Sequence, residues 1–269
     1  LGWLIGHIRI DSGKHKPKRW PHVLSVSLFS IFACKDVVLD ELPTPTDAPF
    51  LLLFLHGSGD TAADWPLDLQ SAVMESLPEE KSWDVWTYDW DEYAESKLSA
   101  SGSGLDVGEL LALQLLEPPY SYEHLHLVGH SVGCFVIHSM EKTISEENET
   151  IGLPLTFLDP FTGNGLLDSA SRGRESAKYA DYAEAFYNKD DSVPSTNGEL
   201  EFAHNFDVTA LRPSNYDEEK PHWWPVDYYL ESVSDDTLKG YVHAQQVLES
   251  GAKELQKQFP RGKETVLGE

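Results

Sequence analysis

The sequence predicts an α/β fold in which helices cover both faces of a mostly parallel β-sheet. A chain of 269 residues is long enough for one domain with a full hydrophobic core. The continuous apolar run Phe50–Leu55 is typical of a strand that is buried on both faces. After it, strand-like and helix-like segments alternate with short connections, which is the pattern of parallel strands joined by crossover helices.

The predicted elements follow from apolar runs for strands and from apolar residues at helical spacing for helices. Residues 91–104 include Ser101-Gly102-Ser103-Gly104 and are predicted to form a flexible loop at the rim of a pocket. The core strands are expected at Phe50–Leu55, Trp83–Tyr88, Leu125–Val128 and Leu155–Leu158, and the helices at Leu67–Ser76, Val107–Leu116, Val132–Lys142, Val226–Val233 and Leu238–Phe259.

The N-terminal part of the chain differs from the rest. A basic run at residues 14–19 precedes the mostly apolar stretch Val23–Ala33 and Cys34. This stretch is too short to cross a bilayer as a helix, but the order is that of a signal peptide or a lipoprotein leader. We therefore expect residues 1–33 to be a leader that directs the protein out of the cytoplasm, as a secreted or membrane-anchored form. The alternative is an edge strand in a cytoplasmic protein.

The remaining domain boundaries follow from composition. The proline-rich segment Thr44–Pro49 predicts that residues 34–49 are a linker, and residues 50–269 then form the main α/β domain. The chain has 45 acidic and 20 basic residues, a net charge of -25. Such a charge repels a polyanionic backbone, so nucleic acid is not an expected partner. The cysteine and histidine spacings match no metal-site pattern, and we predict neither a metal nor a cofactor.

The segment Gly129-His130-Ser131-Val132-Gly133 is a Gly-x-Ser-x-Gly sequence between a predicted strand and a predicted helix. A serine in such a sharp turn has a strained backbone, its hydroxyl stands above the sheet, and the positive helix end faces a developing oxyanion. The sequence therefore predicts Ser131 as a nucleophile. The oxyanion donors are expected to be backbone amides, one from Val132 and one from the loop 56–60 after the first core strand. Ser58 is the predicted donor in this loop.

With these segments in place, the sequence resembles the pancreatic-type lipase and esterase branch of the α/β hydrolases. Four stretches carry the resemblance, and their order is more specific than any one of them. It implies the α/β-hydrolase fold with a nucleophile elbow, and it implies that Asp159 of the Leu-Asp-Pro step is the acid of a catalytic triad. The four stretches are residues 53–57, 84–90, 127–133 and 158–160.

In this fold the triad follows the order Ser, acid, His. His222 precedes a late predicted helix, and the stretch 222–232 is similar to the lipase segment that carries the catalytic histidine. His222 is therefore the predicted base, with His204 as the alternative. Asp190 is the alternative acid, because 189–194 resembles the Asp-x-x-Val-Pro loop of simple esterases.

Together these residues predict a serine hydrolase that cleaves carboxylic esters through an acyl-enzyme on Ser131. The expected substrate is a small-molecule or lipid ester. A thioesterase or an acyltransferase on the same fold is the first alternative, and a non-catalytic binding protein is the second. Trp223 and Trp224 beside the predicted base either line an acyl pocket or pack the histidine loop.

Overall fold

The computed structural model describes residues 37–77, 83–95, 99–163, 175–217, 220–235 and 237–268, and the side chains of 242–245 are not described. The unit that contains the sheet begins at Val37. The predicted leader at residues 1–33 lies outside the described residues. Within the predicted linker, Leu42 is buried in the core and the Thr46 hydroxyl donates to Asp84 Oδ1 at 2.8 Å. Among the described residues, no helix has the length and apolar character needed to span a membrane.

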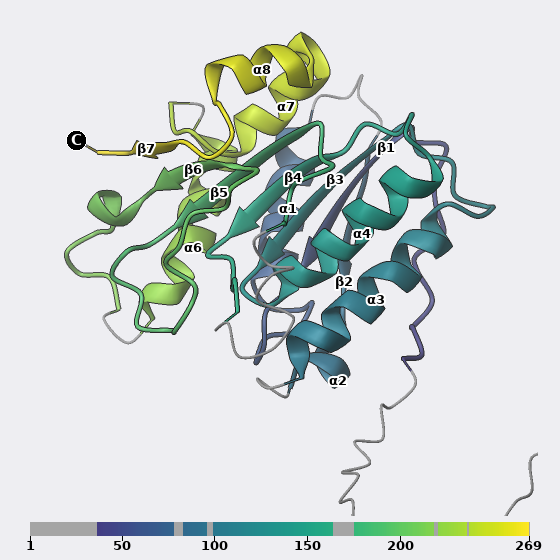
Figure 1. Cartoon of the computed structure of the whole chain (residues 1–269), viewed down its shortest axis with the longest axis horizontal. Coiled ribbons are helices and arrows are strands. Elements are labelled where there is room, and N and C mark those ends of the chain that lie inside the picture. The colour runs from purple at the N-terminus through teal and green to yellow at the C-terminus, as the bar shows by residue number, and fades with distance from the viewer. Residues whose placement is uncertain are drawn as a thin grey trace, which may run out of the picture. The chain divides into compact units, whose positions relative to one another are not determined.

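The centre of the described unit is a seven-stranded sheet in the order β2-β1-β3-β4-β5-β6-β7 (Figure 1). Every neighbouring pair in this sheet is parallel. All four strands predicted for the core are present, so the prediction of a parallel sheet is confirmed. The strands are β1 (Phe50–Leu55), β2 (Trp83–Tyr88), β3 (His124–His130), β4 (Pro154–Leu158), β5 (Tyr182–Tyr187), β6 (His204–Asp207) and β7 (Glu264–Val266).

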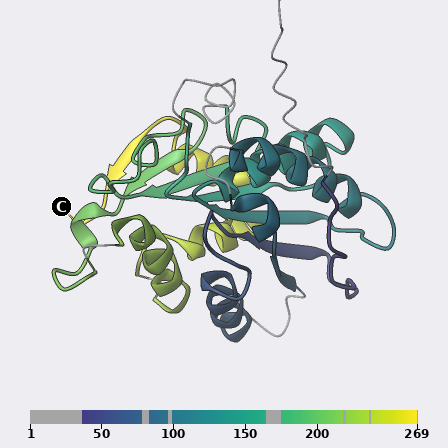
Figure 2. The same ribbon diagram turned by 90° about the horizontal axis from the view of Figure 1, so that it is seen from below.

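Helices cover both faces of this sheet, as the view from below shows (Figure 2). Helices α3 and α4 cover one face, and α1 and α6 cover the other (Figures 1 and 2). The helices are α1 (Trp65–Ser76), α2 (Asp91–Ala94), α3 (Ala100–Leu115), α4 (Gly133–Glu147), α6 (Trp224–Ser234), α7 (Tyr241–Ser250) and α8 (Ala252–Gln258), with short 3-10 helices η1 (Thr209–Leu211) and η2 (Pro221–Trp223).

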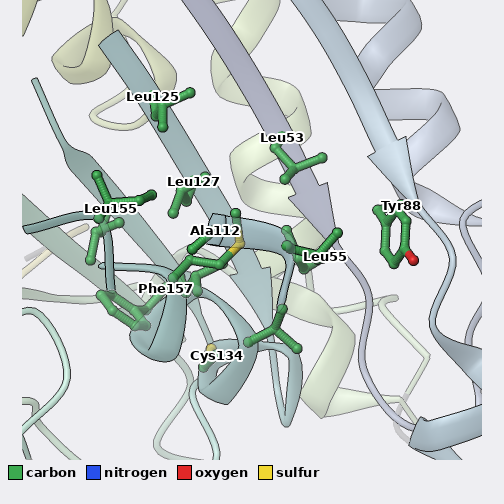
Figure 3. Close-up of a cluster of buried hydrophobic side chains, with 14 of the residues drawn as sticks. Leu53, Leu55, Tyr88, Ala112, Leu125, Leu127, Cys134, Leu155 and Phe157 are labelled. Carbon is green, nitrogen blue, oxygen red and sulfur yellow. The ribbon is translucent and has the colours of Figure 1, made fainter. Parts of the chain in front are cut away.

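Alternation along β1 divides the hydrophobic core into two clusters, because successive side chains of a strand point to opposite faces. Leu51, Leu53 and Leu55 belong to the cluster under α3 and α4. Leu52 and Phe54 belong to the cluster that contains residues of α1 and α6. Figure 3 shows the first cluster, where leucines of β1, β3 and β4 meet side chains of the covering helices. Burial on both faces explains why β1 has no polar residue.

The predicted loop at residues 91–104 is wrong in its described part. Residues 91–94 form α2, and Ser101-Gly102-Ser103-Gly104 lies in the first turns of α3. The small residues serve helix packing: a Cβ on Gly104 would lie 3.3 Å from Phe135 Cβ, and one on Gly108 would lie 2.2 Å from the Val136 carbonyl oxygen. Gly104 and Gly108 therefore allow α3 to approach α4 closely.

The predicted single helix at Leu238–Phe259 is also corrected. The structure has two helices there, α7 and α8, and they are separated at Gly251. Gly251 has a φ of 82°, which is a conformation that interrupts a right-handed helix. Apolar residues at helical spacing continue on both sides of Gly251, and for this reason the sequence pattern predicts a single helix.

The contact between α3 and α4 leads to a stability prediction. We expect Gly108→Ala to lower the free energy of unfolding by about 1–3 kcal/mol, because the added methyl group meets backbone atoms of α4. Gly102→Ala is the matched control on the same helix, because an added Cβ there has no heavy atom within 4 Å. It should raise stability by up to about 1 kcal/mol through helix propensity. Urea unfolding followed by tryptophan fluorescence measures both, and equal stabilities of the two variants would contradict the proposed packing.

Candidate active site

The candidate site lies at the carboxyl ends of β3, β4 and β5. These strands are parallel neighbours, so the residues that follow them gather at one edge of the sheet. Ser131 follows β3, Asp159 follows β4, and Asp191 lies in the loop after β5. The parallel sheet thus brings together three segments that are distant in sequence.

The turn that carries Ser131 is strained. Ser131 has a φ of 53°, a value that few non-glycine residues adopt. Two main-chain hydrogen bonds hold it: its N–H donates to the Leu158 carbonyl at 3.0 Å, and its carbonyl accepts from Phe161 N–H at 3.2 Å. A strained, well-anchored serine between a strand and a helix has the geometry of a nucleophile elbow.

The two glycines of the elbow allow this close packing. A Cβ on Gly129 would lie 2.9 Å from the Gly133 carbonyl oxygen. A Cβ on Gly133 would lie 2.5 Å from the His56 carbonyl oxygen and 2.6 Å from that of Leu55. Glycine at both positions therefore lets the first turn of α4 rest against the ends of β3 and β1.

The loop after β1 lies directly against the serine. A Cβ on Gly57 would be 3.0 Å from Ser131 Cβ, so the backbone of this loop borders the hydroxyl. Ser58, the predicted oxyanion donor, is the next residue and is half-buried. Val132 stands at the N-terminal end of α4, where backbone N–H groups have no partner within the helix. The two segments predicted to supply oxyanion donors thus border Ser131, and the roles of Ser58 and Val132 stay predictions.

His222 is held in η2 between the elbow and the acidic loops. Its Nδ1 lies 2.7 Å from Asp159 Oδ2. The turn is anchored by Asn188, whose side-chain amide donates to the Pro221 carbonyl at 2.9 Å, and by His130, whose Nε2–H donates to the His222 carbonyl at 3.2 Å. The rings of His130 and His222 are also in contact, with centroids 4.6 Å apart. Since His130 precedes Ser131 directly, this contact brings the imidazole to the elbow.

Asp159 is fully buried and, like Ser131, has a left-handed backbone, with a φ of 43°. Its N–H donates to the Phe186 carbonyl at 2.7 Å, and its Oδ1 accepts from Asn188 N–H at 3.3 Å. These bonds to the adjacent strand leave Oδ2 directed at His222.

A second carboxylate, which the sequence reasoning missed, reaches the same imidazole nitrogen. Asp191 Oδ2 lies 2.9 Å from His222 Nδ1, and Oδ1 accepts from Val193 N–H at 3.0 Å. The alternative acid Asp190 points elsewhere: it is largely exposed and pairs with Arg212 at 3.2 Å. The available sequence signal was weak: an aspartate commonly accepts a hydrogen bond from the amide two residues later in a local turn, as Asp191 does from Val193 N–H. That turn directs the second aspartate of the pair inward.

The other candidate groups have different surroundings. Both ring nitrogens of His204 are engaged near the C-terminus, with the Pro260 carbonyl and the Thr265 hydroxyl, each at 2.9 Å. Trp224 is buried and donates to the Val208 carbonyl at 2.7 Å, so it packs the core. Trp223 contacts the ring of His130, with centroids 5.4 Å apart. Trp223 therefore packs against His130, the residue that hydrogen-bonds to the backbone of the His222 turn.

The electrostatics of the cluster favour a protonated imidazole. Burial alone would lower the pKa of His222, but the hydrogen bonds to Asp159 and Asp191 outweigh burial and raise this pKa to about 9. Burial raises the pKa of Asp159 to about 7, although its bond with His222 opposes this. Burial also favours a higher pKa for Asp191. The hydrogen bonds that its carboxylate accepts from His222, Thr196 and Val193 have the larger effect and lower this pKa to about 2.

Within the described residues, Asp159, Asp191 and His222 are also the one group of three potential metal-binding side chains, with ligand atoms within 4.8 Å of one another. Ligand atoms around a tetrahedral zinc ion would stand about 3.4 Å apart, given bond lengths of about 2.1 Å. His222 Nδ1 lies only 2.7 and 2.9 Å from the two carboxylate oxygens. These distances fit shared hydrogen bonds better than ligation, and the predicted absence of a metal stays a prediction.

Comparison with known proteins gives a family match and several structural likenesses. Residues 52–252 match the model of the alpha/beta hydrolase family. Est1E from Butyrivibrio proteoclasticus, solved with ferulic acid bound, is 13% identical, with 74% of this chain and 95% of that chain covered and a TM-score of 0.42. The esterase Pf2001 from Pyrococcus furiosus is 12% identical, with 79% and 82% covered and a TM-score of 0.38. A cutinase from Trichoderma reesei is 13% identical, with 69% and 74% covered and a TM-score of 0.31. No curated protein matches the sequence.

Proposed function

Because this chain belongs to the alpha/beta hydrolase family, we propose that it is a serine hydrolase that cleaves carboxylic esters through an acyl-enzyme on Ser131. One observation carries the proposal: an imidazole bound to a buried carboxylate at 2.7 Å contacts the ring of His130, which directly precedes a strained serine at the carboxyl end of the sheet. A nucleophile, a base and a group that orients the base are the three parts that acyl transfer requires.

In the first step, Ser131 Oγ attacks the ester carbonyl carbon while His222 Nε2 takes the hydroxyl proton. Asp159 holds the Nδ1–H tautomer, leaves Nε2 free to accept, and stabilises the imidazolium that forms. The amides of Val132 and Ser58 bind the oxyanion, an effect of about 3 kcal/mol for each donor in comparable sites. His222 then returns the proton to the leaving alcohol, and the acyl group stays on Ser131.

In the second step, water attacks the acyl-enzyme while His222 removes its proton. The tetrahedral intermediate collapses, the carboxylic acid leaves, and Ser131 regains its proton. The position of Asp159 directly after β4, the strand next to the nucleophile strand, supports the proposed likeness to the pancreatic-type lipase branch. The proposed substrate is a small-molecule or lipid ester.

A fluorophosphonate probe tests the nucleophile. We expect the purified protein to be labelled at one serine and Ser131→Ala to lose the label completely, because the probe reacts with a serine that a base activates. Ser145→Ala is the matched control on α4, since that hydroxyl is exposed and bonds only within its own helix. Labelling that persists in Ser131→Ala would remove Ser131 from the mechanism. Hydrolysis of matched short-chain oxygen esters and thioesters then separates an esterase from a thioesterase.

The raised pKa of His222 gives a pH prediction. The imidazole accepts a proton only in its neutral form, and a pKa raised to about 9 keeps it charged at neutral pH. We therefore expect kcat/KM for a short-chain ester to rise with pH through a midpoint near 9 rather than near the ordinary histidine value of about 6.5. Rates corrected for spontaneous ester hydrolysis between pH 5 and 10 measure this midpoint. A midpoint at or below the ordinary value would contradict the arrangement of charges around His222.

A further inference from the structure

The imidazole of His222 faces two carboxylates at a single nitrogen. Nδ1 lies 2.7 Å from Asp159 Oδ2 and 2.9 Å from Asp191 Oδ2, and both acidic side chains are fully buried. A neutral or charged imidazole has only one proton at Nδ1. This proton therefore has two acceptors at nearly equal distance, whereas one carboxylate is enough to orient the imidazole of a catalytic base.

The two carboxylates come from separate structural elements, and each has its own anchor. Asp159 follows β4; its N–H donates to the Phe186 carbonyl, and its Oδ1 accepts from Asn188 N–H. Asp191 belongs to the loop after β5 and bonds to the Val193 amide and the Thr196 hydroxyl. Neither carboxylate can turn away without losing hydrogen bonds, from the Asn188 amide for Asp159 and from the Val193 amide and the Thr196 hydroxyl for Asp191.

The charges around His222 explain why two buried carboxylates are tolerated there. Buried charges need a partner of opposite sign, and like charges that are close together oppose each other's ionisation. Asp159 faces the imidazole from the end of β4 and Asp191 from the loop after β5. His130 contacts the ring from the end of β3, and burial lowers its pKa, so it adds no positive charge there. Asp60, from the loop after β1, lies 3.5 Å from His130 and adds a further acidic group behind that ring. The imidazolium of His222 is the cation that these groups surround.

We propose that Asp159 and Asp191 share the Nδ1 proton of His222, so that Asp191 is a second positioning residue for the base. Either carboxylate alone keeps the Nδ1–H tautomer and leaves Nε2 open toward Ser131. Together they hold the imidazolium to a higher pH than one carboxylate would. The catalytic consequence rests on the proposed function, whereas the sharing of the proton does not.

Titration of the His222 imidazole by ¹⁵N NMR tests the sharing directly and needs no enzymatic activity. The signal is assigned from its loss in His222→Gln. We expect Asp191→Asn to lower the midpoint by about 1 pH unit or more, because one negative charge at hydrogen-bond distance is removed. Asp159→Asn should lower it likewise, and Asn suits the left-handed backbone at that position. Asp190→Asn is the matched control at the adjacent residue, which pairs with Arg212, and its midpoint should equal that of the unchanged protein.

Asp191→Ser is the second variant, in case Asn disturbs the loop. Its hydroxyl can still accept from the Val193 amide while the charge is removed, so the same fall in midpoint is expected. If Asp191→Asn and Asp191→Ser both titrate like Asp190→Asn, the proton is not shared and the proposal is overturned. Since this readout is independent of hydrolysis, a protein that cleaves no ester would refute the proposed function and leave the proton-sharing result intact.

Hydrolysis rates measured above the titration midpoint of His222 show how well each variant orients the imidazole, because the imidazole is then neutral in every variant and its proton affinity no longer limits the rate. We expect Asp159→Asn and Asp191→Asn each to lower kcat by about 100-fold or less, because one carboxylate remains to fix the tautomer. The double variant should fall by about 10⁴-fold, the loss known for a triad whose single acid becomes an amide. If Asp159→Asn alone showed the full loss of about 10⁴-fold in kcat and Asp191→Asn kept the kcat of the unchanged protein, Asp159 alone would position the imidazole and the proposal would be overturned.

Discussion

The position of helix α4 against the ends of β1 and β3 is the constraint on which the candidate site depends. Gly133 lies so close to the carbonyls of His56 and Leu55 that a methyl group cannot fit between them. This contact places the N-terminal end of α4 beside the loop after β1. Ser131 lies between these two segments, which explains why its backbone takes a strained conformation and why main-chain bonds to β4 have to hold it. Packing between backbones, more than any side-chain contact, sets the geometry of the nucleophile.

The second organising feature is the excess of buried acid on one side of the imidazole. With 45 acidic against 20 basic residues, most of the chain's carboxylates can remain in water. Asp159 and Asp191 are two of several buried acids; their side chains are fully buried, and no lysine or arginine is bonded to them among the described residues. Their charges are balanced by a histidine that titrates, so the charge state of the whole cluster depends on pH. The basicity of His222 and the burial of these acids are two aspects of one arrangement.

The fold was predictable because its signal lies in contiguous segments. The apolar run at β1 and the strand and helix around Ser131 are local patterns, and the α/β-hydrolase fold class inferred from them is confirmed. The start of α3 was not predictable in the same way. A Ser-Gly run has low helix propensity, and it is helical here at the start of a helix whose Gly104 and Gly108 pack closely against α4. The break at Gly251 was hidden by apolar spacing that continues across it.

Within the site, local pattern placed Ser131 in its turn. The resemblance to lipases led to the choice of Asp159 and, together with the position of its loop, to that of His222, and the structure brings these two side chains together. Local pattern could not distinguish Asp190 from Asp191, because neighbouring aspartates in one loop look alike in sequence and point in opposite directions in space. Only the pairing of Asp190 with Arg212 and the turn from Asp191 to Val193 separate them. Three-dimensional contacts of this kind have no counterpart in a spacing rule.

The anchoring of the cluster also says where motion can occur. Main-chain bonds join Ser131 to the end of β4, and Asp159 is bonded in turn to the end of β5, so nucleophile and acid belong to one rigid edge. His222 sits instead on a short turn before α6, whose backbone is bonded to one amide side chain and one neighbouring ring nitrogen, while the two carboxylates bond to its imidazole ring. A swing of the imidazole between serine and leaving group would thus bend this turn alone, while the sheet behind it stays still.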